Sequence, residues 1–294
     1  MNIKVVSPSW FCMWVERAIK MLDEVVDKHK NNIYCVHEIV HNPNVVNYFK
    51  SKWVVFVDNF ENIEDKKNAI LCFSAHWVNK FTLQKVAKTF KKVVNLECPL
   101  VTKVYNEAKM FVEKWKTIFY IWKKGHQEAE QVIEFIKDLW WKVYVFLKEE
   151  EIPQIPKDTE IAVINQTTLN YNYVVSMIEK IKKIYPNTES IWNSDICKAT
   201  FDRQSALKNV LNSIDALIVI WWKNSSNTKE LVKIWENANK KVFFIQHFSE
   251  IKNLDFSWIK NIAITAGAST PTDEVYKCAN LIKSQHNLEN KTWF

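Results

Sequence analysis

Residues 216–246 read A-L-I-V-I-W-W-K-N-S-S-N-T-K-E-L-V-K-I-W-E-N-A-N-K-K-V-F-F-I-Q. A short apolar run (216–220) passes through a polar turn into an amphipathic segment (227–239), and a β-branched and aromatic run (241–246) follows. The pattern predicts a strand, a helix and a second strand. Because strands that alternate with helices favour parallel sheets covered on both faces, we expect an α/β fold.

The same alternation extends along the whole chain. Strands are predicted near residues 3–7, 33–40, 53–58, 69–74, 93–96, 117–121, 142–147, 160–165, 216–220, 241–246 and 261–265. Predicted helices include 15–29, 102–114, 128–139, 172–184, 203–213 and 227–239. Since so many strands exceed one small sheet, we expect three small α/β domains, each with a parallel sheet flanked by helices, over 1–97, 98–193 and 194–294.

Polar motifs follow many of the predicted strands. In open parallel sheets, ligands bind at the carboxyl ends of the strands. If the three sheets point these ends inward, in a pseudo-threefold arrangement, the polar motifs share one central site.

Three of the six cysteines lie in loop-like segments: Cys12 in S-P-S-W-F-C, Cys98 in L-E-C-P-L and Cys197 in S-D-I-C-K. Three thiolates from distant parts of a chain can hold an iron-sulfur cluster and leave one iron open. Zinc is a weaker alternative because the chain has no paired C-x-x-C spacing. The other cysteines, Cys35, Cys72 and Cys278, lie in strand-like or helix-like runs, where cysteine behaves as a small buried hydrophobe.

Composition and charge narrow the class of protein. A hydrophobic fraction of 48% with 25% charged residues is typical of a soluble globular protein. No apolar run approaches the ~20 residues of a membrane span, and no signal peptide is evident, so we expect a cytoplasmic protein with reduced thiols. The net charge of +7 suggests an acidic partner or an anionic substrate. The lysines lack the aromatic interleaving of a nucleic-acid binder.

Glycine is rare and tryptophan abundant in this chain. It has 2 glycines and 14 tryptophans, whereas about 20 glycines are usual for this length. Tryptophans occupy helix ends and tight turns, where glycine is normally needed, at Trp53, Trp115, Trp140, Trp221 and Trp222. One hypothesis is that a stop codon read as glycine by the organism has been translated as tryptophan. The alternative is an authentic tryptophan-rich protein, and Trp258, which has no turn signal nearby, is expected to be genuine.

The motifs, taken in order, resemble the LytB family of 4-hydroxy-3-methylbut-2-enyl diphosphate reductases. They are F-C-x-x-V-x-R-A, H-E-I-V-H-N, F-S-A-H, C-P-L-V-T-K-V, G-H-x-E, Q-T-T-L, D-I-C-x-A-T-x-x-R-Q, K-N-S-S-N-T and T-A-G-A-S. The resemblance covers nearly the whole chain. It implies a two-electron reductive dehydroxylation that yields isopentenyl and dimethylallyl diphosphates, the last step of the methylerythritol phosphate pathway. The family has glycine at Trp10, Trp14, Trp53, Trp77 and Trp122, and commonly around Trp221 and Trp222.

The resemblance also implies roles for individual residues. Cys12, Cys98 and Cys197 would hold a 4Fe-4S cluster with one iron site free for the substrate. Glu128 would supply protons, and Thr168, beside Thr167, would position or relay one. Substrate-binding residues would be His41, His76, His126, Thr168, Ser225, Ser226, Asn227 and Ser269.

Elementary chemistry supports several of these roles without choosing among alternatives. N-S-S-N (224–227) opens a predicted helix, whose free N–H groups favour an anion, although the same pattern can be a simple N-cap. Glu128 at a helix start is otherwise a favourable dipole partner, and the remaining histidines, His29, His37, His247 and His286, are interpreted as ordinary hydrogen-bonded residues.

Departures from the family pattern are Gln127 for proline, Gln131 for glycine and Tyr105 for histidine.

The positive charge suits ferredoxin or flavodoxin as an acidic electron donor, and neither a nucleic acid nor a membrane is expected as a partner. The alternative is a catalytically inactive relative that binds a phosphate ligand and lacks the cluster, if the tryptophans are literal.

Overall fold

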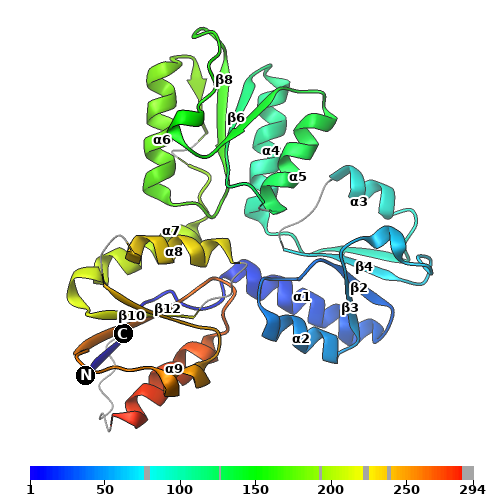
Figure 1. Ribbon diagram of the computed structural model, residues 1–294. Helices are drawn as coiled ribbons and strands as arrows, with labels where there is room; N and C mark the ends of the chain where they lie inside the picture. Colours follow the sequence, from blue (N-terminus) through cyan, green and yellow to red (C-terminus); the bar gives the residue numbers. More distant parts are fainter. Residues whose placement is uncertain (76–79, 126, 192–193, 221–224, 237–239, 287–294) are drawn as a thin grey trace. The chain divides into compact units, whose positions relative to one another are not determined.

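The computed structural model describes residues 1–75, 80–125, 127–191, 194–220, 225–236 and 240–286 (Figure 1). The chain divides into two compact units. The terminal unit comprises Met1–Met13 and Cys197–Phe294, and the middle unit comprises Trp14–Ile196. The described residues of the two units contain three four-stranded sheets, all of whose strand pairs are parallel. The expected α/β class with three parallel sheets is confirmed.

The terminal unit has one sheet with the strand order β1-β12-β10-β11. Its strands are β1 (Asn2–Val5), β10 (Ala216–Ile220), β11 (Lys241–Ile245) and β12 (Asn261–Ala266). All five residues of β10 are buried, because the strand is central and both of its faces are covered.

Helices cover both faces of this sheet. Ala216, Ile218 and Ile220 share a hydrophobic cluster with residues of α9 (Thr272–Gln285) and the short 3₁₀ helix η4 (Phe248–Asn253). The alternate residues Leu217 and Val219 pack in a second cluster with Leu207, Leu231 and Trp235, from α7 (Lys198–Val210) and α8 (Ser226–Glu236). The two-residue period of the strand therefore divides its side chains between the two layers.

The middle unit contains the other two sheets. The first has the order β3-β2-β4-β5. Its elements are α1 (Met13–His29), β2 (Ile33–Val36), α2 (Pro43–Ser51), β3 (Val54–Val57), η1 (Phe60–Asn62), β4 (Ile70–Phe73), α3 (Lys80–Val86) and β5 (Lys92–Asn95). Asn42 caps α2 by accepting hydrogen bonds from the backbone of Asn44 and Val45, which starts the helix directly after His41.

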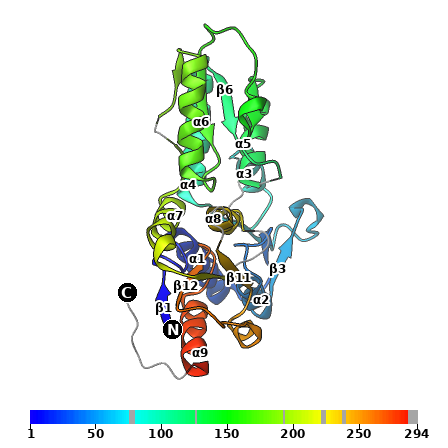
Figure 2. The same ribbon diagram turned by 60° about the vertical axis from the view of Figure 1, so that its left-hand side comes forward.

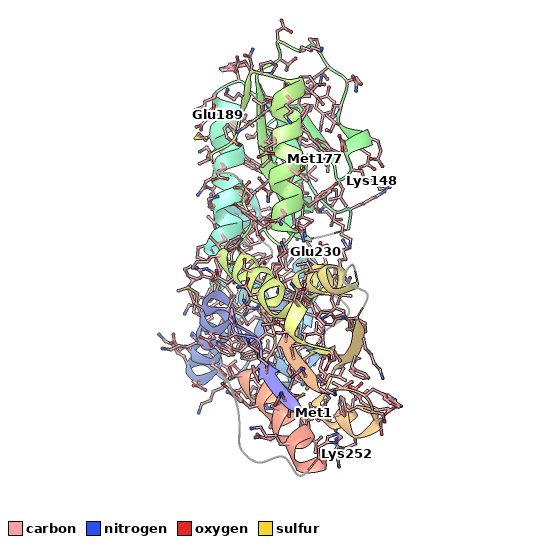
Figure 3. All side chains as sticks on the ribbon, turned by 90° about the vertical axis from the view of Figure 1, so that its left-hand side faces the viewer. Met1, Lys148, Met177, Glu189, Glu230 and Lys252 are labelled. Carbon is pink, nitrogen blue, oxygen red and sulfur yellow. The ribbon has the colours of Figure 1, made fainter. Side chains whose placement is uncertain are left out.

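The second sheet of the middle unit has the order β7-β6-β8-β9. Its elements are α4 (Pro99–Glu113), β6 (Thr117–Ile121), α5 (Gln127–Asp138), β7 (Val143–Phe146), η2 (Glu149–Glu151), β8 (Ile161–Asn165), α6 (Tyr171–Ile184) and β9 (Thr188–Glu189). Ile118 and Tyr120 of β6 share a cluster with α4 and α5, whereas Phe119 and Ile121 pack with α6. Figure 2 shows α6 and α5 on either side of β6, and Figure 3 marks Met177, a buried residue of α6.

Strand pairing departs from the expected division of the chain in one place. β1, which was expected within the first domain (1–97), pairs with β12 in the register Asn2↔Asn261 to Val5↔Ile264. The first strand is thus an edge of the last sheet, and the sheet of the following segment begins at β2. Because pairing across most of the chain has no local sequence signal, the pattern of apolar residues did not reveal it. The short strand β9 was also not predicted.

In the described residues, no helix is both long and apolar enough to cross a membrane.

Three tryptophans occupy left-handed backbone at helix ends, as their sequence positions predicted. The φ angles are +66° at Trp53, +59° at Trp115 and +57° at Trp140. The amide of Trp115 donates to the carbonyl of Val112, and that of Lys116 donates to Phe111. This pair of bonds is a Schellman motif, whose left-handed residue is usually glycine.

Two further tryptophans, Trp258 and Trp235, have contrasting environments. Trp258, which was expected to be genuine because no turn signal lies nearby, has a φ of +75° and is 95% exposed, so it lies in left-handed backbone like Trp53, Trp115 and Trp140. Its backbone makes a turn that the apolar sequence around it conceals. Trp235, by contrast, is fully buried and donates its indole N–H to the carbonyl of Lys240 at 3.1 Å. The structure therefore separates tryptophans that occupy glycine-like positions from one that packs as an indole.

Replacing Trp140 with glycine is expected to stabilise the protein made with literal tryptophan. Its side chain is 96% exposed and contributes little packing, while its left-handed backbone is strained for an L-residue. We expect Trp140→Gly to raise the free energy of unfolding by about 1 kcal/mol, measured by urea denaturation. Trp235→Gly, the control, should lower it by about 3–5 kcal/mol because it empties a core position. Destabilisation by Trp140→Gly would contradict the argument.

Mass spectrometry of the protein isolated from its own host tests the decoding hypothesis. Peptides that contain Trp53, Trp115, Trp140 and Trp258 should have glycine masses at these positions, because each has positive φ. The peptide that contains Trp235 tests selectivity, since its indole is packed and hydrogen-bonded. Tryptophan masses at all four left-handed positions would disprove the hypothesis.

Candidate functional site

Each of the three loop cysteines directly precedes a helix. Cys12 comes before α1, Cys98 is the N-cap of α4 and Cys197 is the N-cap of α7. All three side chains are half-buried. The amide of Cys12 donates to the carbonyl of Ala268 at 3.1 Å, and that of Cys98 donates to Ala75 at 2.8 Å. Backbone contacts thus hold both loops, and the helix N-termini favour an anionic group.

The other three cysteines have a different environment. Cys35, Cys72 and Cys278 are fully buried, and Cys35 and Cys72 are paired residues of β2 and β4. Burial raises the pKa of Cys72 and that of Cys278 to about 12, and raises the pKa of Cys35 well above its ordinary value. These thiols remain protonated at neutral pH, which suits packing and not metal binding.

The three loop cysteines fit an iron-sulfur cluster by the chemistry of their donor atoms. Soft thiolates are the usual ligands of such clusters. Cys12 and Cys197 belong to the terminal unit, whereas Cys98 belongs to the middle unit. Among the described residues, no three His, Cys, Asp or Glu side chains are grouped to hold a metal ion.

A buried arginine lies near Cys12 and Cys197. Arg203 of α7 is 2% exposed, and its charge interacts with both cysteines. One guanidinium nitrogen donates to the carbonyl of Ala199 at 2.8 Å, and the other donates to the carbonyl of Trp10. Burial lowers the pKa of Arg203 from its ordinary value, although an arginine remains protonated in proteins. This corner of the terminal unit therefore has a permanent buried cation.

The N-terminus of α8 is held by side chains of the K-N-S-S-N-T segment. The hydroxyl of Ser225 accepts hydrogen bonds from the amide and hydroxyl of Thr228, at 3.4 and 2.9 Å. Gly267 packs against this turn so closely that a Cβ atom there would lie 2.1 Å from the hydroxyl oxygen of Thr228. One of the chain's two glycines thus lets the T-A-G-A-S loop approach the start of α8.

The terminal unit contains buried polar atoms without hydrogen-bond partners among the described residues. Both amide atoms of Asn227, which is 5% exposed, lack a hydrogen-bond partner. The hydroxyls of Ser9, Thr265 and Thr270 are in the same state. Ser269 is also buried, whereas the side chain of Ser226, the first residue of α8, lies outside the described part. Unpartnered buried amides are rare because each costs free energy, so Asn227 is a candidate residue for binding a polar ligand.

Thr168 is held by a hydrogen bond from a neighbouring side chain. The Gln166 amide donates to its hydroxyl at 2.8 Å and accepts from the backbone of Lys123 at 3.2 Å. Gln166 is fully buried, so it fixes the end of β8 against the end of β6. Thr167 is buried as well. The structure therefore places Thr168 near the loop that leads to α5.

Of the predicted acid and the three predicted histidines, the structure describes only the side chain of His41. Glu128 is the second residue of α5, but its side chain lies outside the described residues, as do His76 and His126. His41 follows β2, and its ring nitrogen Nδ1 lies 3.4 Å from the Glu38 carboxylate. This hydrogen bond lowers the pKa of Glu38, so the carboxylate beside the imidazole stays charged.

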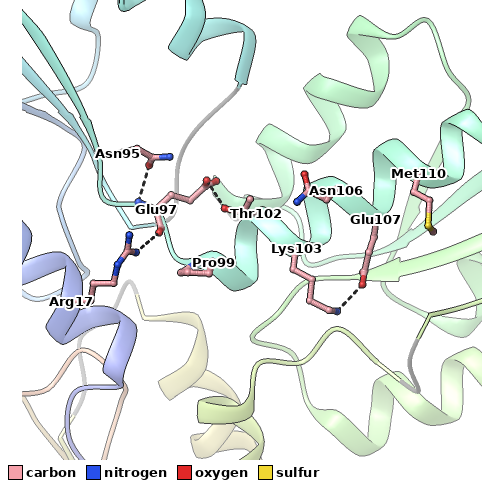
Figure 4. A pocket seen from close by; sticks show the side chains of 9 residues that line it. All are labelled: Arg17, Asn95, Glu97, Pro99, Thr102, Lys103, Asn106, Glu107 and Met110. Atoms are coloured by element: carbon pink, nitrogen blue, oxygen red, sulfur yellow. Dashed lines mark hydrogen bonds and ion pairs between the residues drawn. The ribbon is translucent and has the colours of Figure 1, made fainter.

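A pocket of about 510 Å³ lies in the middle unit, beside the residues on either side of Cys98 (Figure 4). It is lined by Arg17, Asn95, Glu97, Pro99, Thr102, Lys103, Asn106, Glu107 and Met110. Arg17 of α1 donates to the carbonyl of Glu97 at 3.2 Å, and the Glu97 carboxylate accepts from Thr102 at 2.7 Å. These contacts hold the residue that precedes Cys98.

Two buried carboxyl groups and a lysine join α4 to the chain before Cys197. Lys103 lies 2.9 Å from both Glu107 and Asp195. Asp195 also accepts from the amide of Asn165 at 3.0 Å, and its own amide donates to the Asn165 side chain at 2.7 Å. Burial, followed by hydrogen bonding to Asp195, raises the pKa of Glu107 to about 8. The Glu107 carboxyl group is consequently mostly protonated at neutral pH.

Sequence reasoning missed the charged residues around the cysteines. The four missed residues all lie inside the quoted cysteine motifs: Arg17, Lys103, Asp195 and Arg203. A charged residue within a motif that contains a proposed ligand could therefore have indicated them. Tyr105, one of the departures from the family pattern, is a core residue whose ring stacks on Phe135 at 3.9 Å between centroids.

Residues 3–283 match the family described as LytB protein. The 4-hydroxy-3-methylbut-2-enyl diphosphate reductase of Neorickettsia sennetsu is 32% identical over 288 residues, which cover 97% of this chain and 92% of that protein. The protein of the same name from Wigglesworthia glossinidia brevipalpis is 35% identical over 285 residues, which cover 96% and 90% of the two chains.

Solved structures agree with the sequence comparison. The structure of E-1-hydroxy-2-methyl-but-2-enyl-4-diphosphate reductase from Plasmodium falciparum has a TM-score of 0.89 and 27% identity, and the match covers 99% of this chain and 91% of that one. A structure of (E)-4-hydroxy-3-methyl-but-2-enyl diphosphate reductase has a TM-score of 0.70 and 25% identity over 97% and 100% of the two chains. The motifs, the three parallel sheets and these matches together establish that the chain belongs to the LytB family.

Proposed function

We propose that this protein is a 4-hydroxy-3-methylbut-2-enyl diphosphate reductase, an oxidoreductase of the non-mevalonate route to isoprenoids. The observation that carries the proposal is the family match over residues 3–283, which includes every motif with a predicted site residue. Relatives with this name align over more than nine-tenths of the chain. A catalytically inactive relative is the weaker alternative, since the cysteine, serine and asparagine side chains of those motifs are all present.

The diphosphate is proposed to bind at the start of α8. Ser225, Ser226, Asn227 and Ser269 would donate hydrogen bonds to its oxygens, and the backbone N–H groups of the helix would add to them. The unpartnered Asn227 amide supports this assignment because a buried donor gains most from an anionic acceptor. His41, His76 and His126 would line the same substrate, the first two toward the diphosphate.

The reaction replaces the allylic hydroxyl group with hydrogen. The substrate takes up two electrons and two protons, its C–O bond breaks, a C–H bond forms at either end of the allyl unit, and water leaves. A 4Fe-4S cluster held by Cys12, Cys98 and Cys197 would supply the electrons singly and act as a Lewis acid. Glu128 would hold the proton that departs with the hydroxyl, and Thr168, positioned by Gln166, would orient that hydroxyl.

Several features suit such an enzyme. The buried cysteines Cys35, Cys72 and Cys278 are free thiols, which is usual in a reducing cytoplasm. The net charge of +7 favours a small acidic electron donor, ferredoxin or flavodoxin. We infer three α/β domains over 1–97, 98–193 and 194–294, apart from β1, which pairs in the last sheet.

Removing one proposed ligand tests the cluster assignment. After anaerobic loading with iron and sulfide, Cys98→Ser should lose bound iron and at least about 100-fold of the activity, because a ligand matters more than the outer-shell groups that cost 10–100-fold. Cys278→Ala is the control, since Cys278 is buried in α9 with a protonated thiol. Equal iron content in the two variants would refute the assignment of Cys98.

Replacing Asn227 tests the diphosphate site. Asn227→Leu should raise KM by about 10–100-fold, because a hydrogen bond to a charged group is lost. The ligand-free protein should melt at the same or a higher temperature, since its Asn227 amide is unpartnered. The control is Asn261→Leu. Asn261 is the first residue of β12, and its side chain accepts a solvent-exposed hydrogen bond from Asn2. An unchanged KM with a lowered melting temperature would indicate a purely structural asparagine.

A further inference from the structure

Three cations recur at nearly the same distance after the proposed cluster ligands. Arg17 lies five residues after Cys12, Lys103 lies five after Cys98, and Arg203 lies six after Cys197. Each is on the helix that its cysteine precedes, which is α1, α4 or α7. The spacing places every cation about one and a half turns into its helix.

Each cation contacts the chain just before a different cysteine. Arg17 donates to the carbonyl of Glu97, one residue before Cys98. Lys103 donates to the carboxylate of Asp195, two residues before Cys197. Arg203 donates to the carbonyl of Trp10, two residues before Cys12. The helix that follows each proposed ligand therefore holds the segment that leads to the next one, and the three contacts form a closed cycle along the chain.

The choice of residue type is informative. Among the 40 lysines and arginines of the chain, only Arg17 and Arg203 are arginines. A chain that otherwise uses lysine retains arginine at two of these three positions, and at Arg203 the planar fork donates to two carbonyls, Ala199 and Trp10. Lysine has a single nitrogen at its tip and cannot reproduce that geometry.

We propose that Arg17, Lys103 and Arg203 are positioning residues that fix the three cysteine loops for cluster binding. The inference rests on the proposed function, because it assumes that the cysteines hold the cluster. A cluster ligated by thiolates is negatively charged, so the buried Arg203 would in addition stabilise its reduced form.

Burial and the number of contacts predict an order of importance. Arg203 is 2% exposed and has two carbonyl acceptors. Lys103 has a 33% exposed side chain and two acidic partners, Glu107 and Asp195. Arg17 is exposed, with a hydrogen bond of 3.2 Å to Glu97. The effect of substitution should therefore decrease from Arg203 to Lys103 to Arg17.

The test measures how fast a ferrous chelator removes iron from the loaded, full-length protein after reduction. Arg203→Gln should lose iron about 10–100-fold faster than the unaltered chain, and Lys103→Met and Arg17→Gln should show smaller increases in that order. Lys109→Met is the matched control, because Lys109 is on α4 and pairs only loosely with Glu113, at 3.7 Å. The melting temperature of each unloaded variant shows whether folding itself has changed.

Conservative variants and the reduction potential separate positioning from general stability. Arg17→Lys and Lys103→Arg should retain iron like the unaltered chain, because one donor is sufficient at these sites. Arg203→Lys should lose iron quickly but keep the cluster potential near its original value, since the positive charge remains. Arg203→Gln should lower the potential, because removing a cation destabilises the reduced cluster.

The proposed function and the positioning role of the three cations are contradicted by different results. If the unaltered chain binds no iron and sulfide, the proposed function fails and the inference fails with it. If it binds a cluster but all three cation variants release iron at the rate of Lys109→Met, the inference alone is overturned. Faster release that only follows a lower melting temperature, with no change of potential in Arg203→Gln, would also overturn it.

Discussion

The structure depends on one geometric constraint, the parallel strand that ends in a loop and continues into a helix. In a parallel sheet all such loops emerge at the same edge, and every helix that follows presents its positive end there. In this chain, Cys98 lies in the loop after β5, Thr168 in the loop after β8, and Ser225 between β10 and α8. Chemistry that requires thiolates, hydroxyls and an anion site is consequently confined to one edge of each sheet.

Buried charge and hydrogen-bond donors would compensate the anions that are proposed to bind at this edge. A thiolate-ligated cluster and a diphosphate are both anionic, and burying either requires partners. Arg203 supplies a buried cation beside Cys12 and Cys197, and Asn227 supplies a buried amide that has no hydrogen-bond partner within the described part of the chain. Both features are costly in a simple structural protein, because burial desolvates the guanidinium charge and removes water from the Asn227 amide. They are expected in a protein whose stability is partly supplied by its ligands.

Local features were predictable from sequence, whereas distant pairing was not. The α/β class, nearly all strands and the left-handed backbone of Trp53, Trp115 and Trp140 followed from apolar periodicity and helix-end patterns. The pairing of β1 with β12 joins residues at opposite ends of the chain, which no local pattern reports. The turn at Trp258 was hidden because glycine, its usual signal, is absent from the sequence. At the site, residue types were predictable, but the cation contacts of Lys103 and Arg203 required coordinates.

The central claim is that this chain reduces an allylic diphosphate alcohol with a cluster held by its three loop cysteines. The most direct test loads the protein with iron and sulfide under anaerobic conditions, then adds 4-hydroxy-3-methylbut-2-enyl diphosphate with a chemical reductant and separates the products. The account predicts repeated turnover to isopentenyl and dimethylallyl diphosphates. A protein that binds the full cluster and the substrate, yet forms neither product, would contradict it.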